Sequence, residues 1–396
     1  MSALPPPRAV LPVLVFSQFA GTSLWFAGNA VLAELTAELD LVGDAVSVLT
    51  SSVQLGFIAG TLLFAILNVA DLFSPSRVFL AASIAGASAN LLIATFAEGM
   101  RDLVVLRFLT GVALAGIYPV GMKIAASWYP GGLGRALGWL VGALVVGTAF
   151  PRLLRSFDVA LSWKGVIFGT SILAVLGGIA LVSFVGDGGH LPRSSRFDPR
   201  AAWAAFRSRE FRASSFGYFG HMWELYAFWA FVPGLIHARA SIDGSASDAA
   251  TSLTAFCVIG AGGVACVLGG WAVGRWGSAR VAALCLIVSA SSCLLSPVML
   301  MLAPSGIWIG FLVIWGMAVV GDSPQFSALN ASSAPREHVA SALTFVVSTG
   351  FLITIPAIEL TSHALASYGP RYAFLPLAVG PILGILALVP ALRSKG

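Results

Sequence analysis

Long apolar stretches alternate with short polar segments along almost the whole chain. A helix needs about 20 mostly apolar residues to cross about 30 Å of hydrocarbon. By that measure the pattern predicts an all-α membrane protein with twelve spanning helices, six on either side of a longer polar stretch. The first six are predicted at 11–34, 44–68, 78–98, 103–126, 136–156 and 164–186, and the second six at 213–237, 250–273, 281–302, 307–330, 339–363 and 371–391.

The composition supports a lipid environment. Hydrophobic residues make up 58% of the chain and charged residues only 10%, and the mean hydropathy is +0.91. A soluble domain carries about 25% charged residues because its surface faces water. The net charge of +5 does not indicate a nucleic-acid partner, because the basic residues cluster in segments between the predicted helices. Basic loops of this kind are typical of the cytoplasmic side of a membrane protein.

The Lys and Arg residues predict the orientation of the chain. Most of them fall on one side of the predicted bilayer, including six arginines between 187 and 212. Both termini are therefore predicted to be cytoplasmic, in a bacterial inner membrane. We expect an N-terminal six-helix half (1–186), a basic cytoplasmic linker (187–212) with an interfacial helix over 199–212, and a C-terminal six-helix half (213–396). Only Arg101, Arg152, Arg155, Lys164, Arg239 and Arg371 fall on the opposite side.

The two predicted halves share a repeat. Residues in and after the fourth span recur in and after the tenth, each shifted by 205 positions. An internal duplication of six helices predicts a binding site between the halves, near the bilayer midplane. The matched residues are Gly111, Gly116, Pro119, Ala126, Ser127 and Pro130 with Gly316, Gly321, Pro324, Ala331, Ser332 and Pro335.

At these residues the chain resembles the major facilitator superfamily. The loop between spans two and three contains a loosened version of the family motif G-x-L-x-D-R-x-G-R-K, and the loop between spans eight and nine is closer to it, with Gly274 where an acid is usual. In the family this loop is a conformational latch in which the acid pairs with helix ends and arginines. The resemblance implies the latch residues Asp71, Arg77, Arg275 and Arg280.

The fourth span resembles the family motif L-x-x-x-R-x-x-Q-G-x-G-A-A. Arg107 falls on the motif arginine, which the resemblance links to proton coupling. The fifth-span antiporter motif is poorly matched by Gly147 and Pro151, which argues against a drug/proton antiporter. The general appearance is similar to the branch of nitrate, nitrite and cyanate transporters. The spans 44–68 and 250–273 lack the two arginines that clamp nitrate in that branch, so nitrate itself is not expected.

Intramembrane ionisable groups are the candidates for chemistry, because a charge at the bilayer centre is costly. Glu224 and His221 lie three residues apart on span seven and share one helix face. Burial disfavours the charged form of a carboxyl, which makes proton exchange feasible. Asp322 lies beside Pro324, where a kinked helix exposes polar groups. We predict proton coupling by Glu224, Asp322 and His221, although interhelical packing would explain the same residues.

A second group of residues is predicted to bind the solute. Arg107 could hold an anion or neutralise an acid, or form a structural ion pair. Lys123, closer to the helix end, is interpreted as a snorkelling side chain. Trp25 could instead face lipid or pack against other helices. The predicted solute-binding residues are Arg107, Gln18, Trp25, Asn29, Gln54, Tyr118, His221 and Gln325.

Together these features predict a monomeric secondary active transporter, proton-coupled, that moves a small polar, anionic solute by alternating access. The alternative is a proton-driven exporter of drug-like or amphipathic metabolites. A channel would need a continuous polar pore. An enzyme is not expected, since the chain lacks H-E-x-x-H and G-x-S-x-G motifs. No cofactor or metal is expected, and without a G-x-x-x-x-G-K-[ST] loop ATP is not expected to drive transport.

Overall fold

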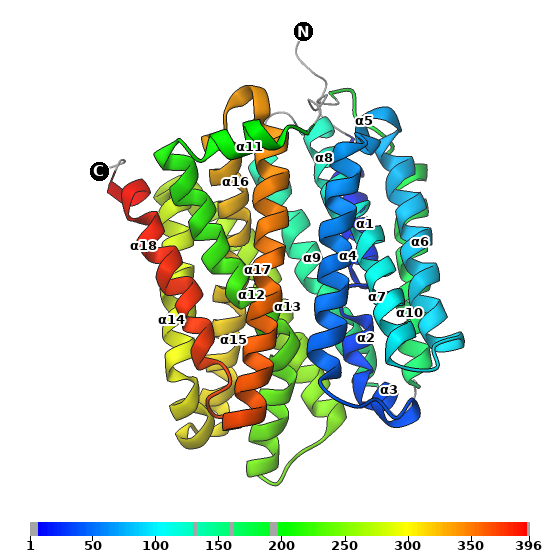
Figure 1. Cartoon of the computed structure of the whole chain (residues 1–396), viewed down its shortest axis with the longest axis vertical. Coiled ribbons are helices and arrows are strands. Elements are labelled where there is room, and N and C mark those ends of the chain that lie inside the picture. Colours follow the sequence, from blue (N-terminus) through cyan, green and yellow to red (C-terminus); the bar gives the residue numbers. More distant parts are fainter. Residues whose placement is uncertain (1–6, 130–132, 158–161, 191–196, 394–396) are drawn as a thin grey trace.

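The computed structural model describes residues 7–129, 133–157, 162–190 and 197–393. Figure 1 shows two sets of helices side by side. The N-terminal set comprises α1 (Val10–Thr22), α2 (Ala27–Ala30), α3 (Leu32–Glu38), α4 (Ala45–Ile66), α5 (Val69–Leu72), α6 (Pro75–Thr95), α7 (Met100–Ala115), α8 (Tyr118–Trp128), α9 (Leu133–Arg155) and α10 (Trp163–Phe184). The C-terminal set comprises α12 (Arg209–Ile242), α13 (Asp248–Trp276), α14 (Ser278–Leu302), α15 (Ser305–Gly321), α16 (Ser323–Ser333), η1 (Arg336–His338), α17 (Val339–Tyr368), η2 (Leu375–Ala378) and α18 (Val379–Arg393). The short helix α11 (Pro199–Ala205) precedes α12 in the chain and packs against α17.

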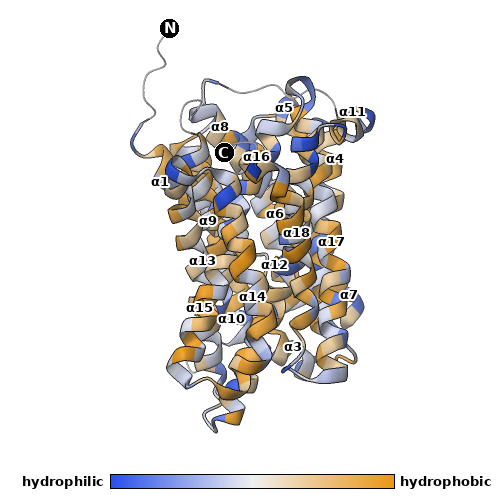
Figure 2. Cartoon of the chain, turned by 90° about the vertical axis from the view of Figure 1, so that its left-hand side faces the viewer, coloured by the Kyte–Doolittle hydropathy of each residue, from blue (hydrophilic) through white to orange (hydrophobic). Residues whose placement is uncertain are grey.

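Ten helical segments in the described residues are long and apolar enough to cross a membrane. The two other predicted spans correspond to the interrupted segment α1–α3 and to α12, whose 34 residues include several charged side chains. Large apolar side chains such as Ile172, Leu294 and Leu383 are exposed along the sides of the bundle. In Figure 2 the hydrophilic residues gather toward the ends and hydrophobic ones cover the sides. This distribution is that of a protein surrounded by lipid.

Three of the predicted spans are interrupted, which corrects the expectation of continuous helices over 11–34, 103–126 and 307–330. The first span breaks after Thr22, and α2 and α3 follow as separate short helices. The fourth breaks between α7 and α8, and the tenth breaks between α15 and α16. Pro119 and Pro324 lie in the first turn of α8 and α16, where a missing N–H costs least.

The repeat in the sequence is also a repeat in the packing. A Cβ atom on Gly111 of α7 would overlap the carbonyl oxygen of Val53 on α4, and one on Gly316 of α15 would overlap that of Val258 on α13. Both residues of the second pair lie 205 positions after those of the first. Close backbone contact through glycine is how helices associate in a membrane, where lipid is as apolar as the side chains. The duplicated unit therefore conserves its helix contacts in both sets.

The two sets meet along two seams, α4 against α17 and α9 against α13. In the second seam Gly142 and Gly263 face one another so closely that a Cβ on either would lie 3.0 Å from the other's carbonyl oxygen. The end of the bundle with α5, α11 and the last turn of α18 is called the linker end (Figure 1). The opposite end, with α3, is called the far end.

The basic linker contains a shorter helix than predicted. The expected helix over 199–212 is interrupted between α11 and α12. The Asp198 side chain accepts from backbone N–H groups at the start of α11, and the Ser208 hydroxyl accepts from the N–H of Phe211 at the start of α12. Such residues favour helix starts because they satisfy N–H groups that lack a partner within the helix. Arg193 and Arg196 of the predicted linker lie outside the described residues.

Candidate solute and proton site

Glu224 is held by three donors inside the C-terminal set. Its side chain is 1% exposed. Trp315 Nε1 donates to Oε1 at 2.7 Å, Ser289 Oγ donates to Oε2 at 2.5 Å, and Cys293 Sγ donates to Oε1 at 3.3 Å. The sequence singled out the acid and missed its partners, because a serine, a cysteine and a tryptophan in apolar runs carry no signal of their own. Because these hydrogen bonds satisfy both carboxyl oxygens, Glu224 can be buried in the membrane without an unpaired polar atom.

His221 and Asp322 form a buried pair beside Glu224. His221 Nδ1 lies 2.8 Å from Asp322 Oδ1, and both side chains are almost completely buried. Asp322 is the residue at which α15 ends and α16 begins, so the helix break brings it against α12. Within the described part of the chain, His221 Nε2 and the Gln325 amide nitrogen are buried without a hydrogen-bond partner. The structure thus brings together all three predicted proton-coupling groups, and one of them, His221, is also a predicted solute ligand.

Arg107 contacts the interrupted first span and lies in the N-terminal set. Its Nη1 donates to the carbonyl oxygen of Leu24 at 3.0 Å, and its Nη2 donates to that of Trp25. Both carbonyls belong to the non-helical segment after α1, where the helix no longer supplies N–H partners. The side chain is fully buried, and its Nε has no partner among the described residues. Arg107 and Glu224 therefore have separate partners in different sets.

The remaining predicted solute ligands in the N-terminal set lie around the same break. Trp25 Nε1 donates to Gln54 Oε1 at 3.3 Å, and Asn29 Nδ2 donates to Thr50 Oγ1 at 2.7 Å. The Gln18 amide lies against Gly121 of α8. In the described residues, both polar atoms of Gln18, the Gln54 nitrogen and the Asn29 oxygen are buried without hydrogen bonds. These are polar atoms that a solute could satisfy.

Aromatic rings from both sets fill the centre of the α4–α17 seam. The rings of Phe57 and Phe351 have centroids 4.3 Å apart, and Trp25 stacks on Phe351 at 5.7 Å. Tyr226 of α12 contacts Trp25 and Phe351, with centroids 5.6 and 5.1 Å away. Tyr118 of α8 is partly buried and packs against the buried core that contains these rings. The aromatic cluster consists of Trp25, Phe26, Phe57, Tyr226, Trp229 and Phe351.

At the far end the two sets are joined by reciprocal acid–serine contacts between α4 and α17. Ser47 Oγ of α4 donates to Glu359 Oε1 of α17 at 2.5 Å, and Ser362 of α17 donates to Asp44 at the start of α4. These four residues are called the far-end clasp. Each helix supplies one acid and one hydroxyl, so the contacts hold the two sets together at this end.

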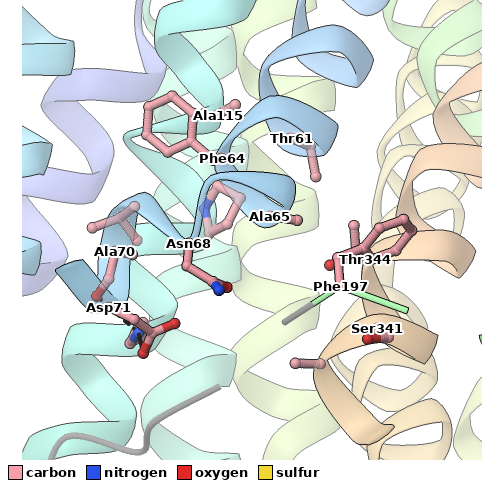
Figure 3. A pocket seen from close by; sticks show the side chains of 14 residues that line it. Thr61, Phe64, Ala65, Asn68, Ala70, Asp71, Ala115, Phe197, Ser341 and Thr344 are labelled. Carbon is pink, nitrogen blue, oxygen red and sulfur yellow. Dashed lines mark hydrogen bonds and ion pairs between the residues drawn. The ribbon is translucent and has the colours of Figure 1, made fainter. Parts of the chain in front are cut away.

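At the linker end the same seam opens into a pocket of about 260 Å³. Figure 3 shows Asn68 and Asp71 from the N-terminal set on one side and Phe197, Ser341 and Thr344 on the other. Lys123 Nζ lies 2.6 Å from Asp71 Oδ1. The full lining is Thr61, Phe64, Ala65, Asn68, Ala70, Asp71, Ala115, Pro119, Val120, Lys123, Phe197, Ala340, Ser341 and Thr344.

Of the four latch residues expected from the family motif, the acid forms an ion pair and the three arginines are exposed. Asp71 pairs with Lys123, whose Nζ also donates to the Ala70 carbonyl at 2.8 Å. Lys123 was interpreted from the sequence as a snorkelling side chain, yet it lies one turn after Pro119 and reaches the latch acid. Arg77, Arg275 and Arg280 are exposed. Within the described residues no group of three or more His, Cys, Asp or Glu side chains gathers as metal ligands would.

Comparison with known proteins agrees with this architecture. The Major Facilitator Superfamily model matches residues 13–357. A segment of 120 residues is 31% identical to an uncharacterized MFS-type transporter, YybF, of Bacillus subtilis (strain 168), and covers 30% of this chain and 28% of that protein. The chain thus spans about a quarter of the length of this curated relative.

The matched model covers most of the chain, and the chain belongs to the major facilitator superfamily. The expected fold is confirmed: an all-α membrane protein of twelve spans in two six-helix, pseudo-symmetric halves. The narrower resemblance to nitrate, nitrite and cyanate transporters stays a prediction.

Proposed function

We propose that this protein is a proton-coupled secondary active transporter that moves a small polar, anionic solute by alternating access. The observation that carries the proposal is the buried group formed by Glu224, His221 and Asp322 on α12 and at the α15–α16 break. Ionisable side chains inside a membrane are expensive and mark ion or proton pathways. We further propose that it acts as a monomer without a cofactor and catalyses no covalent chemistry.

The coupling proposal rests on what surrounds Glu224. All three of its donors are neutral groups, namely a hydroxyl, an indole and a thiol. Neutral donors stabilise a carboxylate less than a cation would, so loss and gain of a proton both remain accessible. His221, one turn earlier, provides a second proton-exchanging group with a direct contact to Asp322. A proton entering this group would change the charge at the helix break.

Alternating access is supported by the unequal ends of the seam between the sets. The far-end clasp and the aromatic cluster close it on one side, and the pocket of about 260 Å³ opens it on the other. We propose that this is an inward-facing arrangement, with the linker end in the cytoplasm of a bacterial cell. The sets 1–186 and 213–396 would then rock against one another, with 187–212 as the connection.

The preference for an anion rests on the unsatisfied donors. In the described residues, Arg107 Nε and the side-chain nitrogens of Gln18, Gln54 and Gln325 are buried without an acceptor. Leaving a buried donor unpaired costs about 1–3 kcal/mol. A solute rich in acceptor oxygens, such as a carboxylate or an oxyanion, would satisfy several of them at once.

The aromatic cluster favours a second candidate, export of amphipathic compounds. Large aromatic side chains bind flat apolar ligands and also attract cations through their ring faces. Trp25, Tyr226 and Phe351 would provide such a surface once the sets separate. If this second candidate is right, the transported compound is recognised by its shape and apolar area, and transport depends little on a negative charge on that compound.

A transport screen in proteoliposomes tests the proposal. Purified protein is given an inward proton gradient and radiolabelled monocarboxylates, dicarboxylates, inorganic oxyanions, neutral polar solutes or amphipathic cations. We expect an anion to accumulate, and a protonophore to abolish the accumulation. Efflux of amphipathic cations without anion uptake would favour the second candidate, and accumulation that is insensitive to the protonophore would contradict proton coupling.

A further inference from the structure

A second pocket lies at the linker end, entirely within the C-terminal set. Its volume is about 500 Å³, and residues of α12, α14, α16 and α18 line it. It shares no lining residue with the pocket of Figure 3. Neither the buried group of Glu224, His221 and Asp322 nor the predicted solute site includes this pocket. Any function of the pocket is therefore separate from theirs.

The lining of this pocket has an apolar part and a polar part. Leu388, a fully buried side chain of α18, lines it together with Leu329 of α16. The polar part has the guanidinium groups of Arg209 and Arg393 and several hydroxyls. The complete lining is Arg209, Glu210, Ser214, Ala279, Leu329, Ser332, Ser333, Leu388, Pro390, Ala391 and Arg393.

The charges around the pocket favour an anion. Among the described residues, neither Arg209 nor Arg393 forms an ion pair with a carboxylate. Glu210, the one acid in the lining, already accepts from Ser208 Oγ at 2.9 Å. Two arginines against one acid leave the pocket with N–H donors and a net positive charge.

The position of the pocket distinguishes a lipid from a soluble anion. The two outer helices that line it, α14 and α18, expose apolar side chains to the surroundings, with Leu284 49% and Leu386 62% exposed. The pocket therefore borders the lipid-facing surface at the level where the helices end. Basic pockets between helices at the cytoplasmic end of a membrane protein are suited to anionic headgroups.

We propose that this pocket binds the headgroup of an anionic phospholipid from the leaflet at the linker end. The phosphate is held by the guanidinium groups of Arg209 and Arg393. The upper part of an acyl chain packs against Leu388 and Leu329. Bound lipid would join the first turn of α12 to the last turn of α18, and α12 is the helix that carries His221 and Glu224.

Lipid titration of the purified full-length protein in detergent, followed by native mass spectrometry, tests the proposal. Phosphatidylglycerol is compared with phosphatidylcholine in the wild type, in R209Q/R393Q and in the control R275Q. Arg275 is an exposed arginine near the end of α13 that does not line the pocket. We expect the double variant to bind phosphatidylglycerol about 30-fold more weakly, with R275Q unchanged and phosphatidylcholine binding weak throughout.

Two further measurements make each outcome decisive. The unfolding temperature without added lipid shows whether the double variant is folded. Competition with glycerol 1-phosphate separates a lipid from a soluble anion: we expect little displacement of phosphatidylglycerol. Equal binding of both lipids, wild-type affinity in R209Q/R393Q, an equal loss in R275Q or full displacement by glycerol 1-phosphate would each overturn the proposal.

Discussion

Ser47 of α4 donates a 2.5 Å hydrogen bond to Glu359 of α17, although 312 residues separate them in the chain. This contact and its counterpart between Ser362 and Asp44 join the two helix sets at the far end. If the sets rock apart there during transport, these bonds must break in every cycle. The clasp therefore stabilises the far-end-closed arrangement, and holding it closed should stop transport.

Cross-linking at the clasp tests this role. In a Cys257→Ser background, which removes the exposed native thiol, Ser47→Cys/Glu359→Cys is treated with a short bis-methanethiosulfonate reagent. We expect solute uptake to stop, because the far end cannot open, and to return after reduction. Each single-cysteine variant treated in the same way is the control. Wild-type uptake by the fully cross-linked protein would show that the seam between α4 and α17 does not open.

Glu224→Gln tests proton coupling. The amide has the shape of the acid and can still accept from Trp315 and Cys293, and the Ser289 hydroxyl can turn to accept from its nitrogen. We expect solute exchange to continue, while accumulation driven by a pH gradient is lost. For one proton per solute, a gradient of one pH unit supports about tenfold accumulation. Proteoliposome uptake with and without the gradient measures both quantities.

The control for this variant is Glu98→Gln, at an exposed acid before α7. It should accumulate solute like the wild type. Wild-type accumulation by Glu224→Gln would assign the coupling role to Asp322 or His221, or indicate that transport is not driven by protons.

We expect the buried pair of His221 and Asp322 to contribute to the free energy of unfolding. Removing one partner of a buried hydrogen-bonded pair costs about 1–3 kcal/mol, because the other is left unsatisfied. We expect His221→Gln and Asp322→Asn each to lower the free energy of unfolding. The double variant should be destabilised by less than the sum, since its two amides can pair. Denaturant unfolding in detergent measures the cycle, and strictly additive losses would mean that the two side chains do not interact.

Arg107→Lys separates a structural role from a role in solute binding. The guanidinium donates to two carbonyls at the break in the first span, and a compact ammonium group cannot match that fork. We expect a loss of about 1–3 kcal/mol in unfolding free energy. Arg101→Lys, at an exposed arginine at the start of the same helix, is the control. A raised KM with unchanged stability would instead identify Arg107 as a solute ligand.

The proposed orientation can be tested by labelling in intact cells. Ser245 lies in an exposed position between α12 and α13 at the far end, and Ala204 is an exposed residue of α11 at the linker end. In the Cys257→Ser background, Ser245→Cys should react with an impermeant maleimide added outside. Ala204→Cys should react only after the cells are opened. The reverse pattern would invert the topology.

The sequence by itself determined the class of fold, because each signal it used is local. Apolar runs of the right length define spans wherever they occur, since the bilayer acts on every helix separately. The repeat at 205 positions indicated two related halves, and it reappears in the contacts of Gly111 with Val53 and of Gly316 with Val258. Glu224 and Asp322 were also recognisable, because a charge in an apolar run is conspicuous without knowledge of its partner.

Only the tertiary structure decided which groups meet. The target of Arg107 is a pair of backbone carbonyls, and every residue has a carbonyl, so the sequence could not single them out. The role of Lys123 depended on the place of Asp71, which lies 52 residues earlier and on another helix. The far-end clasp uses serines and acids near helix ends, which are common at any water-facing boundary. Contacts between distant segments depend on how helices pack, and that information is distributed over many side chains and carried by none alone.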